Sequence, residues 1–118
     1  MGRLSTHVLD IQAGRPAADV AIELVRIGSD GAASPVRTVR TNADGRTDTP
    51  LLAGDELTTG VYEIRFHVGD YFRRQGQKLP EPAFVDVVPI RFGIADAAGH
   101  YHVPLLVSPW AFSTYQGS

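Results

Sequence analysis

The 118-residue sequence contains no cysteine. A chain without thiols forms no disulfide bond, has no thiolate metal site and carries no cysteine nucleophile. The sequence also lacks any apolar run near the roughly 18 residues that a membrane-spanning helix needs, and its first residues lack the apolar segment of a secretory signal. We therefore expect a cytoplasmic protein that does not bind membranes.

The sequence also lacks any cluster of charged residues of one sign. The chain has 11 basic and 13 acidic residues, mixed along its length, and a formal net charge of -2. Proteins that bind nucleic acids usually carry a basic patch or stripe, so nucleic acid is not an expected partner. With 43% hydrophobic and 20% charged residues, the composition is ordinary for a globular protein. The length predicts a single domain over residues 1–118 with one hydrophobic core.

No long stretch has the 3.6-residue apolar period of an amphipathic helix. Apolar runs of strand length follow one another instead, separated by turn residues, and this is the pattern of an antiparallel all-β sandwich or barrel with about eight strands. The expected strands cover residues 4–11, 20–27, 36–41, 61–68, 84–94, 101–107 and 111–115. Because Asn, Asp and Gly tolerate positive φ, the sequence Asn42-Ala43-Asp44-Gly45 is a strong turn signal between them.

Residues 61–68 have the clearest alternation of apolar and polar side chains. Four apolar residues are expected to face the core and three polar residues to face water: Tyr62, Ile64, Phe66 and Val68 against Glu63, Arg65 and His67. Asp70 then stands at a helix N-cap position, before the only expected helix at residues 71–75. In the strand 84–94, Phe84 is expected in phase with the buried positions, and Pro89 must lie on a sheet edge or at a bulge.

The segment 100–118 is dense in polar and aromatic groups. It holds two histidines, two tyrosines and three serines in two strand-like runs, which are separated by the turn pair Ser108-Pro109. Chain ends are usually poorly ordered unless tertiary contacts hold them. We therefore expect this tail to pair with a sheet, and we expect the functional site where it docks.

Strand parity places polar side chains on the outside of two predicted strands. If the odd-numbered residues of 101–107 fill the core, His102 and Leu106 point outward. An outward leucine beside a histidine indicates a face that another subunit covers. In the first strand, Ser5 and His7 share one face in the same way.

The histidines are the candidate proton carriers, because the unperturbed pKa of histidine lies near 6.5. His7 and His102 are candidates for that role, but a structural role stays open for both, and periodicity alone does not bring them together. His67 and His100 are interpreted as surface or structural residues. A two-histidine metal site is not favoured, because neither a thiolate nor an inward-facing histidine pair is available.

Arg46 directly follows the Asp44-Gly45 turn, so a loop end can aim its guanidinium. A planar cation with five donors could hold a carbonyl oxygen or an acidic imide there. The alternative is a solvated charge beside a turn. Spacing alone does not decide between the two interpretations.

Several segments, in order and nearly from end to end, resemble the transthyretin-like proteins that act as 5-hydroxyisourate hydrolases. They are STHVLD (5–10) with Gly14 and Pro16, TNADGR (41–46), HYHVPLL (100–106) with Ser108-Pro109, and STYQGS (113–118). Each segment alone is only moderately specific, whereas their order makes the combination specific. One position departs from the family pattern, because the family ending usually reads Tyr-Arg-Gly-Ser and this chain has Gln116.

The resemblance implies a transthyretin-type sandwich of two four-stranded sheets with one short helix. It also implies a homotetramer, a dimer of dimers, with the sites in a channel at the dimer–dimer interface. Catalytic roles are implied for His7, Arg46 and His102, and substrate binding for Arg46, Tyr115 and Ser118. The implied reaction is the hydrolytic opening of 5-hydroxyisourate to 2-oxo-4-hydroxy-4-carboxy-5-ureidoimidazoline in urate breakdown, a part of purine catabolism, without a cofactor or metal.

The roles of these groups are implied in outline. A neutral imidazole of His7 or His102 would take a proton from water, and Arg46 would stabilise the developing oxyanion. The other histidine would orient water or protonate the leaving nitrogen. Gln116 keeps hydrogen-bonding capacity but loses the charge and fork of arginine. We therefore expect weaker affinity or tail order, which a Gln116→Arg variant would reverse in kinetics or thermal stability.

Two other functions stay open. The hormone-carrying relatives hold small aromatic ligands in the same channel without catalysis, so a non-catalytic small-ligand carrier is the main alternative. A structural β-sandwich module is the second. Neither has a chemical need for the combination of His7, Arg46 and His102.

Overall fold

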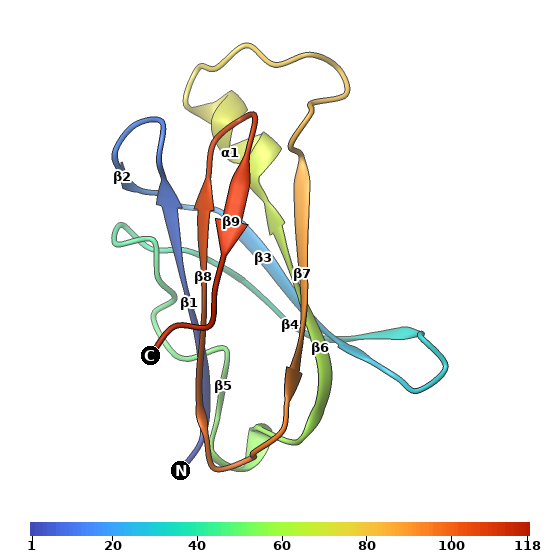
Figure 1. Cartoon of the computed structure of the whole chain (residues 1–118). Coiled ribbons are helices and arrows are strands. Elements are labelled where there is room, and N and C mark those ends of the chain that lie inside the picture. Colours follow the sequence, from blue (N-terminus) through green and yellow to red (C-terminus); the bar gives the residue numbers. More distant parts are fainter.

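Two β-sheets face each other in the computed structural model, which describes residues 1–118 (Figure 1). One of them, called the β6 sheet, has four antiparallel strands in the order β4-β3-β6-β7. Its strands are β3 (Ala21–Ile27), β4 (Ala33–Arg40), β6 (Gly60–His67) and β7 (Val87–Ile94). Each of them overlaps a run that the sequence predicted as a strand.

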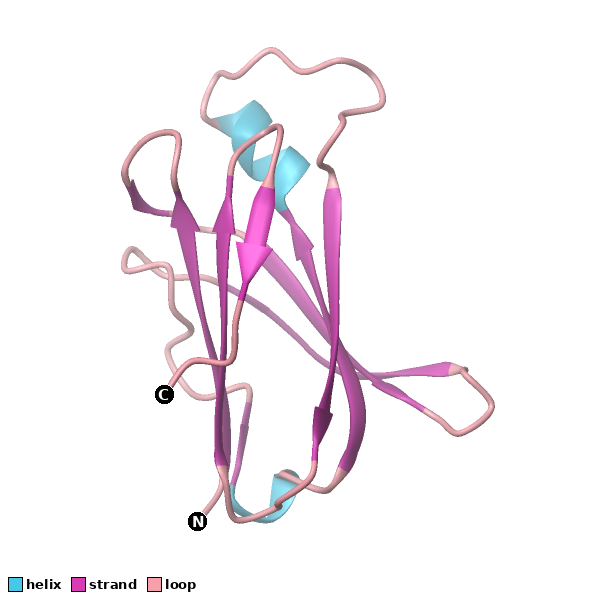
Figure 2. Ribbon diagram, viewed as in Figure 1, coloured by secondary structure: helices cyan, strands magenta, loops and turns pink.

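The other sheet, called the β1 sheet, contains both candidate histidines, His7 and His102. Its strands are β1 (Arg3–Asp10), β2 (Arg15–Pro16), β5 (Leu52–Ala53), β8 (His100–Val107) and β9 (Phe112–Thr114). Their order is β2-β1-β8-β9, and β5 also pairs with β1. β1 and β8 pair in parallel, so the expectation of a purely antiparallel arrangement is wrong for this pair, whereas β9 returns antiparallel to β8 (Figure 2). The all-β sandwich is confirmed, and β2 and β5 are two short strands that the sequence did not predict.

One hydrophobic core of 22 buried residues fills the space between the sheets. In β1 the even-numbered residues 4–10 are buried, while the odd-numbered residues 5–9 are half-buried on the outer face. In β8 the odd-numbered residues 103–107 are buried, and His102 and Leu106 are half-buried on the other face. Burying one Val or Leu side chain fully stabilises a fold by about 1.5–3 kcal/mol. A one-residue slip would turn a whole buried row outward, so the core fixes which side chains form the outer face.

The single α-helix, α1 (Val68–Arg74), continues directly from β6. The sequence predicted Asp70 as the N-cap, but the helix begins two residues before it, and that prediction is wrong. The backbone N–H groups of Val68 and Gly69 donate to the carbonyl of Asp86 at 3.1 and 3.0 Å. A distant loop therefore satisfies the first turn of the helix, and no capping side chain is needed. No helix of the chain is long and apolar enough to cross a membrane.

β7 starts at Val87, three residues later than the predicted strand. Phe84 is 78% exposed and lies before the strand, so its predicted place among the buried positions is wrong. The residues before β7 cap α1 through Asp86 instead of pairing with β6. Pro89 lies in β7, which is an edge strand, as expected for a residue without an N–H donor. A 3₁₀ turn, η1 (Gly54–Glu56), follows β5.

The outer face of β6 is less hydrated than the sequence alternation predicted. Glu63 is only 7% exposed, although its position in the pattern is polar. The Nε atoms of Arg65 and Arg91 donate to its carboxylate at 2.8 and 3.2 Å. The hydrogen bond from Arg65 is the main cause that lowers the pKa of Glu63. A charged group is therefore buried there because two guanidinium groups neutralise it.

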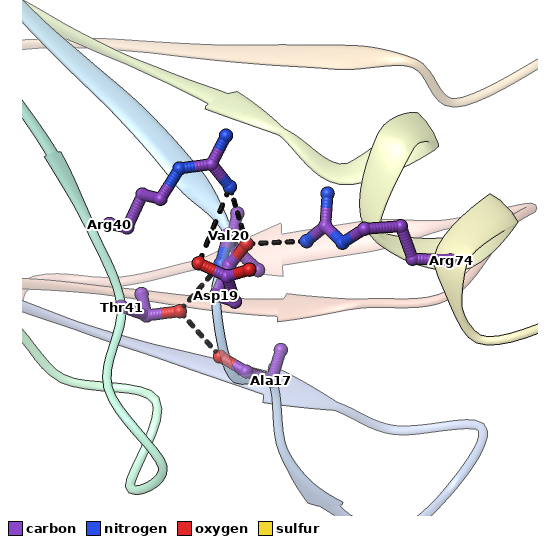
Figure 3. A network of polar contacts seen from close by, with 6 residues as sticks. All are labelled: Ala17, Asp19, Val20, Arg40, Thr41 and Arg74. Carbon is purple, nitrogen blue, oxygen red and sulfur yellow. Dashed lines mark hydrogen bonds and ion pairs between the residues drawn. The ribbon is translucent and has the colours of Figure 1, made fainter.

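A polar network fixes the point where β4 ends (Figure 3). The backbone carbonyl of Asp19, which has a φ of 60°, accepts hydrogen bonds from Arg40 on β4 and from Arg74 on α1. Thr41, the residue after β4, donates from its hydroxyl to the Ala17 carbonyl at 2.7 Å. This network holds the start of the loop that carries Arg46.

Candidate active site

The parallel pairing of β1 with β8 brings the two candidate histidines to one face. In the register of this pair, Ser5 lies opposite His102 and His7 lies opposite Pro104. Both histidines point to the outer face. His7 lies on β1 two residues beyond Ser5, the residue opposite His102, so the two histidines differ by one outward-facing position along neighbouring strands. The Oγ of Ser5 lies 2.8 Å from the Nδ1 of His102.

The C-terminal tail holds His102 from the other side. β9 pairs with β8, and the chain then crosses β8 so that the N–H of Gly117 donates to the carbonyl of His102 at 2.8 Å. A Cβ atom at position 117 would lie 2.5 Å from the Cδ2 atom of the His102 ring, closer than real Cβ atoms come. Only glycine lets the backbone pass over the imidazole at this distance. The prediction that the tail pairs with a sheet is confirmed.

The surroundings of His102 favour its neutral form. Burial is the first cause that lowers the pKa of His102, and the positive charges of Arg46 and His7 add to it. A weaker interaction with the Ser5 backbone acts in the opposite sense. The imidazole of His102 is therefore neutral at pH 7 and able to accept a proton.

His7 is tied to the loop that carries Arg46. Its Nε2 lies 2.9 Å from the backbone carbonyl of Asp44. A carbonyl oxygen only accepts hydrogen bonds, so Nε2 carries the proton and donates it. The Nδ1 of His7 has no hydrogen-bond partner.

The Arg46 loop is a tight turn that docks on β1. The side-chain oxygen of Asn42 accepts hydrogen bonds from the backbone N–H groups of Asp44 and Arg46 at 2.9 and 3.2 Å. Gly45 has a φ of 74°, and a Cβ atom there would lie 2.4 Å from the carbonyl of Val8. Glycine is therefore required both for the turn and for the contact with β1. The guanidinium of Arg46 makes no hydrogen bond or ion pair within the chain.

A hollow of about 260 Å³ collects most of these groups. Arg46, His102 and Ser118 line it, and they come from the loop after β4, from β8 and from the tail. Its other lining residues are Arg3, Ser5, His100 and Tyr101. His7 does not line this hollow, although its charge acts on His102. The structure thus brings three of the five predicted site residues together and places His7 next to them.

Tyr115 lies in a different place from the other predicted site residues. It is 61% exposed and lines a separate hollow of about 360 Å³, together with Gln116 and residues of β7. Of the five predicted site residues, only His102 lines both hollows. No group of three His, Asp or Glu side chains is arranged to hold a metal ion.

The model of the HIUase/Transthyretin family matches residues 4–117. The chain belongs to this family. The 5-hydroxyisourate hydrolase of Ralstonia nicotianae is 60% identical over 118 residues, which make up 100% of both chains.

Solved structures of the family share the fold. One chain of (S)-allantoin synthase is 47% identical, with a TM-score of 0.92, over 99% of the present chain but only 44% of its own length. Sea bream transthyretin in complex with thyroxine is 29% identical, with a TM-score of 0.85, over 98% of the present chain and 94% of its own. These similarities confirm the transthyretin-type sandwich.

Sequence reasoning on this family member gave no site role to four residues of the hollow, namely Arg3, Ser5, His100 and Tyr101, and the first two belong to β1. Ser5 was placed on the outer face of β1 but was given no role, and Arg3 was not considered. Strand parity could have found both, because Arg3, Ser5 and His7 alternate along one face of β1. The contact of Ser5 with His102 and the place of Arg3 in one hollow with Arg46 were not visible, because they depend on pairing with β8 and on the docked loop.

Proposed function

We propose that this chain hydrolyses 5-hydroxyisourate, opening its ring to 2-oxo-4-hydroxy-4-carboxy-5-ureidoimidazoline in urate breakdown. The observation that carries the proposal is the shared hollow, in which a neutral imidazole faces a guanidinium without a partner. The named activity of the Ralstonia relative, which is identical at 60% of positions along the whole chain, supports the same reaction.

His102 acts as the general base in this proposal. For a neutral imidazole to accept a proton at Nε2, its Nδ1 must carry the hydrogen. The Oγ of Ser5, 2.8 Å away, can accept that hydrogen and so keep the ring in the required tautomer and orientation. Nε2 then takes the proton of a water molecule as the water attacks a ring carbonyl of the substrate.

Arg46 and His7 complete the chemistry. The attack places negative charge on the carbonyl oxygen, and the guanidinium of Arg46 stabilises it in a hollow that is partly shielded from water. His7 lies beside the Arg46 loop with Nδ1 available, so Nδ1 accepts a hydrogen bond that orients the attacking water, or, in the imidazolium form, supplies its own proton to the leaving ring nitrogen. Ser118 provides a hydroxyl at the edge of the same hollow.

The proposal includes a homotetramer, a dimer of dimers, in the cytoplasm. Trp110, Phe112 and Tyr115 are large exposed side chains on β9 and its flanks, next to the outer face of the β1 sheet. Apolar surface of this kind is typical of subunit interfaces. A second copy would cover this face. Its Tyr115 would then reach the hollow of the first copy, which the first copy's own Tyr115 does not line.

The direct test is the ultraviolet decay of freshly generated 5-hydroxyisourate. The protein should accelerate this decay over buffer, with the carboxylate product identified by mass and chirality. Sizing chromatography under the assay conditions should give the mass of four chains. Decay no faster than in buffer would remove the proposed activity.

A non-catalytic carrier is the second candidate, because the solved sea bream transthyretin holds thyroxine. A carrier would bind thyroxine or a similar aromatic ligand in a titration and leave 5-hydroxyisourate unchanged. The lowered pKa of His102 favours the hydrolase, because a carrier has no use for a neutral imidazole facing an arginine.

A further inference from the structure

Two arginines of this chain differ from all the others. The sequence contains ten arginines. Eight of them form side-chain hydrogen bonds or ion pairs: Arg15, Arg26, Arg37, Arg40, Arg65, Arg73, Arg74 and Arg91. Arg3 and Arg46 are the two whose guanidinium groups have no partner.

Both of these arginines line the same two hollows. They face the hollow of about 260 Å³ that contains His102 and Ser118. They also line an adjacent hollow of about 230 Å³, which has hydroxyl side chains and no hydrophobic residue in its wall. Ser5 is common to both walls, so Arg3 and Arg46 lie along the boundary between the hollows.

The chain supplies no counter-ion for this pair. Asp48 lines the second hollow, but its carboxylate accepts a hydrogen bond from the side chain of Asn42 at 3.1 Å and forms no ion pair with either arginine. Two cations that share a concave, partly shielded wall raise the local positive potential. An anion that enters the hollow therefore meets two guanidinium groups, each with five N–H donors, and neither group is engaged in a hydrogen bond or ion pair within the chain.

We propose that Arg3 is a substrate-binding residue, which forms with Arg46 a two-guanidinium site for an oxyanion of the ligand. This rests on the function proposed above. The matching groups are the deprotonated imide of the purine-derived ring and the carboxylate that hydrolysis creates. Planar guanidinium groups hold such oxygen pairs bidentately.

The two arginines have different tasks within this site. Arg46 is among the groups that lower the pKa of His102, so its charge reaches the reacting end of the hollow. Arg3 lies opposite His100 in the β1–β8 pair, whereas Ser5, the residue in contact with His102, comes one side-chain step further along the same face. Arg3 therefore contributes to binding rather than to the chemical step, and its loss should appear in KM and leave kcat nearly unchanged.

The experiment compares Arg3→Gln with Arg3→Lys and with a matched control, Lys78→Gln. Lys78 is exposed in the loop between α1 and β7, and its replacement removes the same charge away from the hollow. We expect Arg3→Gln to raise KM for 5-hydroxyisourate roughly tenfold, with kcat within about twofold, and Arg3→Lys to recover part of the loss. Added salt weakens the attraction between Arg3 and the anionic substrate in the wild type. Arg3→Gln lacks this attraction, so its KM should rise less steeply with salt concentration. Lys78→Gln should match the wild type.

A binding measurement separates this inference from the proposed function. Urate, an anionic purine that the reaction does not open, is titrated calorimetrically into each variant. Weaker urate binding by Arg3→Gln supports the anion site, even if the wild type does not hydrolyse 5-hydroxyisourate. If the wild type hydrolyses and Arg3→Gln keeps the KM, salt dependence and urate affinity of Lys78→Gln, the inference is wrong while the function stands. A changed assembly state with unchanged KM would also overturn it, because Arg3 would then serve a subunit interface.

Discussion

The outer faces of the two sheets carry the same kinds of charged side chain, but in opposite states of pairing. On the β6 sheet, Glu63 binds Arg65 and Arg91, and His67 contacts the carboxylate of Glu23. On the β1 sheet, His102 and Arg3, together with Arg46 from the loop that docks on β1, face a hollow without any carboxylate bound to them. The difference shows how a histidine and an arginine become available for a ligand. A histidine and an arginine are available when no carboxylate of the chain pairs with them, unlike their counterparts on the β6 sheet.

The largest expected effect separates the histidines of the two faces. His102→Asn removes the proposed base and should lower kcat roughly 10³-fold, with an unchanged assembly state by sizing chromatography. His67→Asn, on the β6 sheet, should keep wild-type turnover. Both are measured by 5-hydroxyisourate decay. Equal activity of the two variants would remove the functional distinction between the faces.

The next effect tests how the tail holds the imidazole. In Gly117→Ala the added methyl group would meet the His102 ring, so the ring or the tail must move, and we expect kcat to fall roughly tenfold to hundredfold. Gly31→Ala is the control. Its φ of 85° makes it strained, but its Cβ meets no atom within 4 Å. It should lose thermal stability and keep kcat, whereas full activity of Gly117→Ala would contradict the close contact.

The pH profile tests the charge that reaches His102. Because the pKa of His102 is lowered, the neutral base persists to a pH below its ordinary range, and the acidic limb of kcat should lie there. Arg46→Gln removes a cation that disfavours protonation, so the pKa of His102 rises and the acidic limb moves to higher pH. Arg65→Gln on the other sheet should leave the limb in place. An unmoved limb in Arg46→Gln would mean that another group titrates.

The smallest effect concerns the paired face. Glu63→Gln should lower the free energy of unfolding by about 1 kcal/mol at pH 7, measured in urea, with turnover unchanged. The pKa of Glu63 is lowered in the folded state, so its contribution is present above the ordinary carboxyl pKa of about 4.3. It is lost as the pH falls through the lowered value, where variant and wild type should become equally stable. A loss of activity instead would mean that the paired face takes part in function.

Local patterns predicted much of the fold. The strands and the outward position of His102 follow from side-chain alternation, which is a property of neighbouring residues, whereas the arrangement in two sheets was implied by the family resemblance. The start of α1 and the late start of β7 did not follow, because both depend on one carbonyl, that of Asp86, which lies just before β7 and accepts hydrogen bonds from the first turn of α1 at the end of the neighbouring strand β6. The burial of Glu63 was not predicted for the same reason. One of the two arginines that neutralise it, Arg91, lies on the neighbouring strand β7.

The site was predicted as a set of residues rather than as a geometry. Motif resemblance named His7, Arg46, His102, Tyr115 and Ser118, and the structure gathers three of them in one hollow with His7 beside them. Tyr115 lies in another hollow of the same chain, which no sequence pattern indicated. Arg3 carries no motif, and only the absence of a partner distinguishes it from the other arginines.

The sequence by itself determined the chemistry available to this protein. It excluded thiols, set the strand faces by their two-residue period and formed the Asn42–Arg46 turn from residues that tolerate positive φ. The tertiary structure alone decided that Ser5 meets His102 across 97 positions of sequence, and that the tail passes over the imidazole at Gly117. Such contacts depend on burying two whole strand faces in one core, and that free energy belongs to the assembled sheets rather than to any local segment.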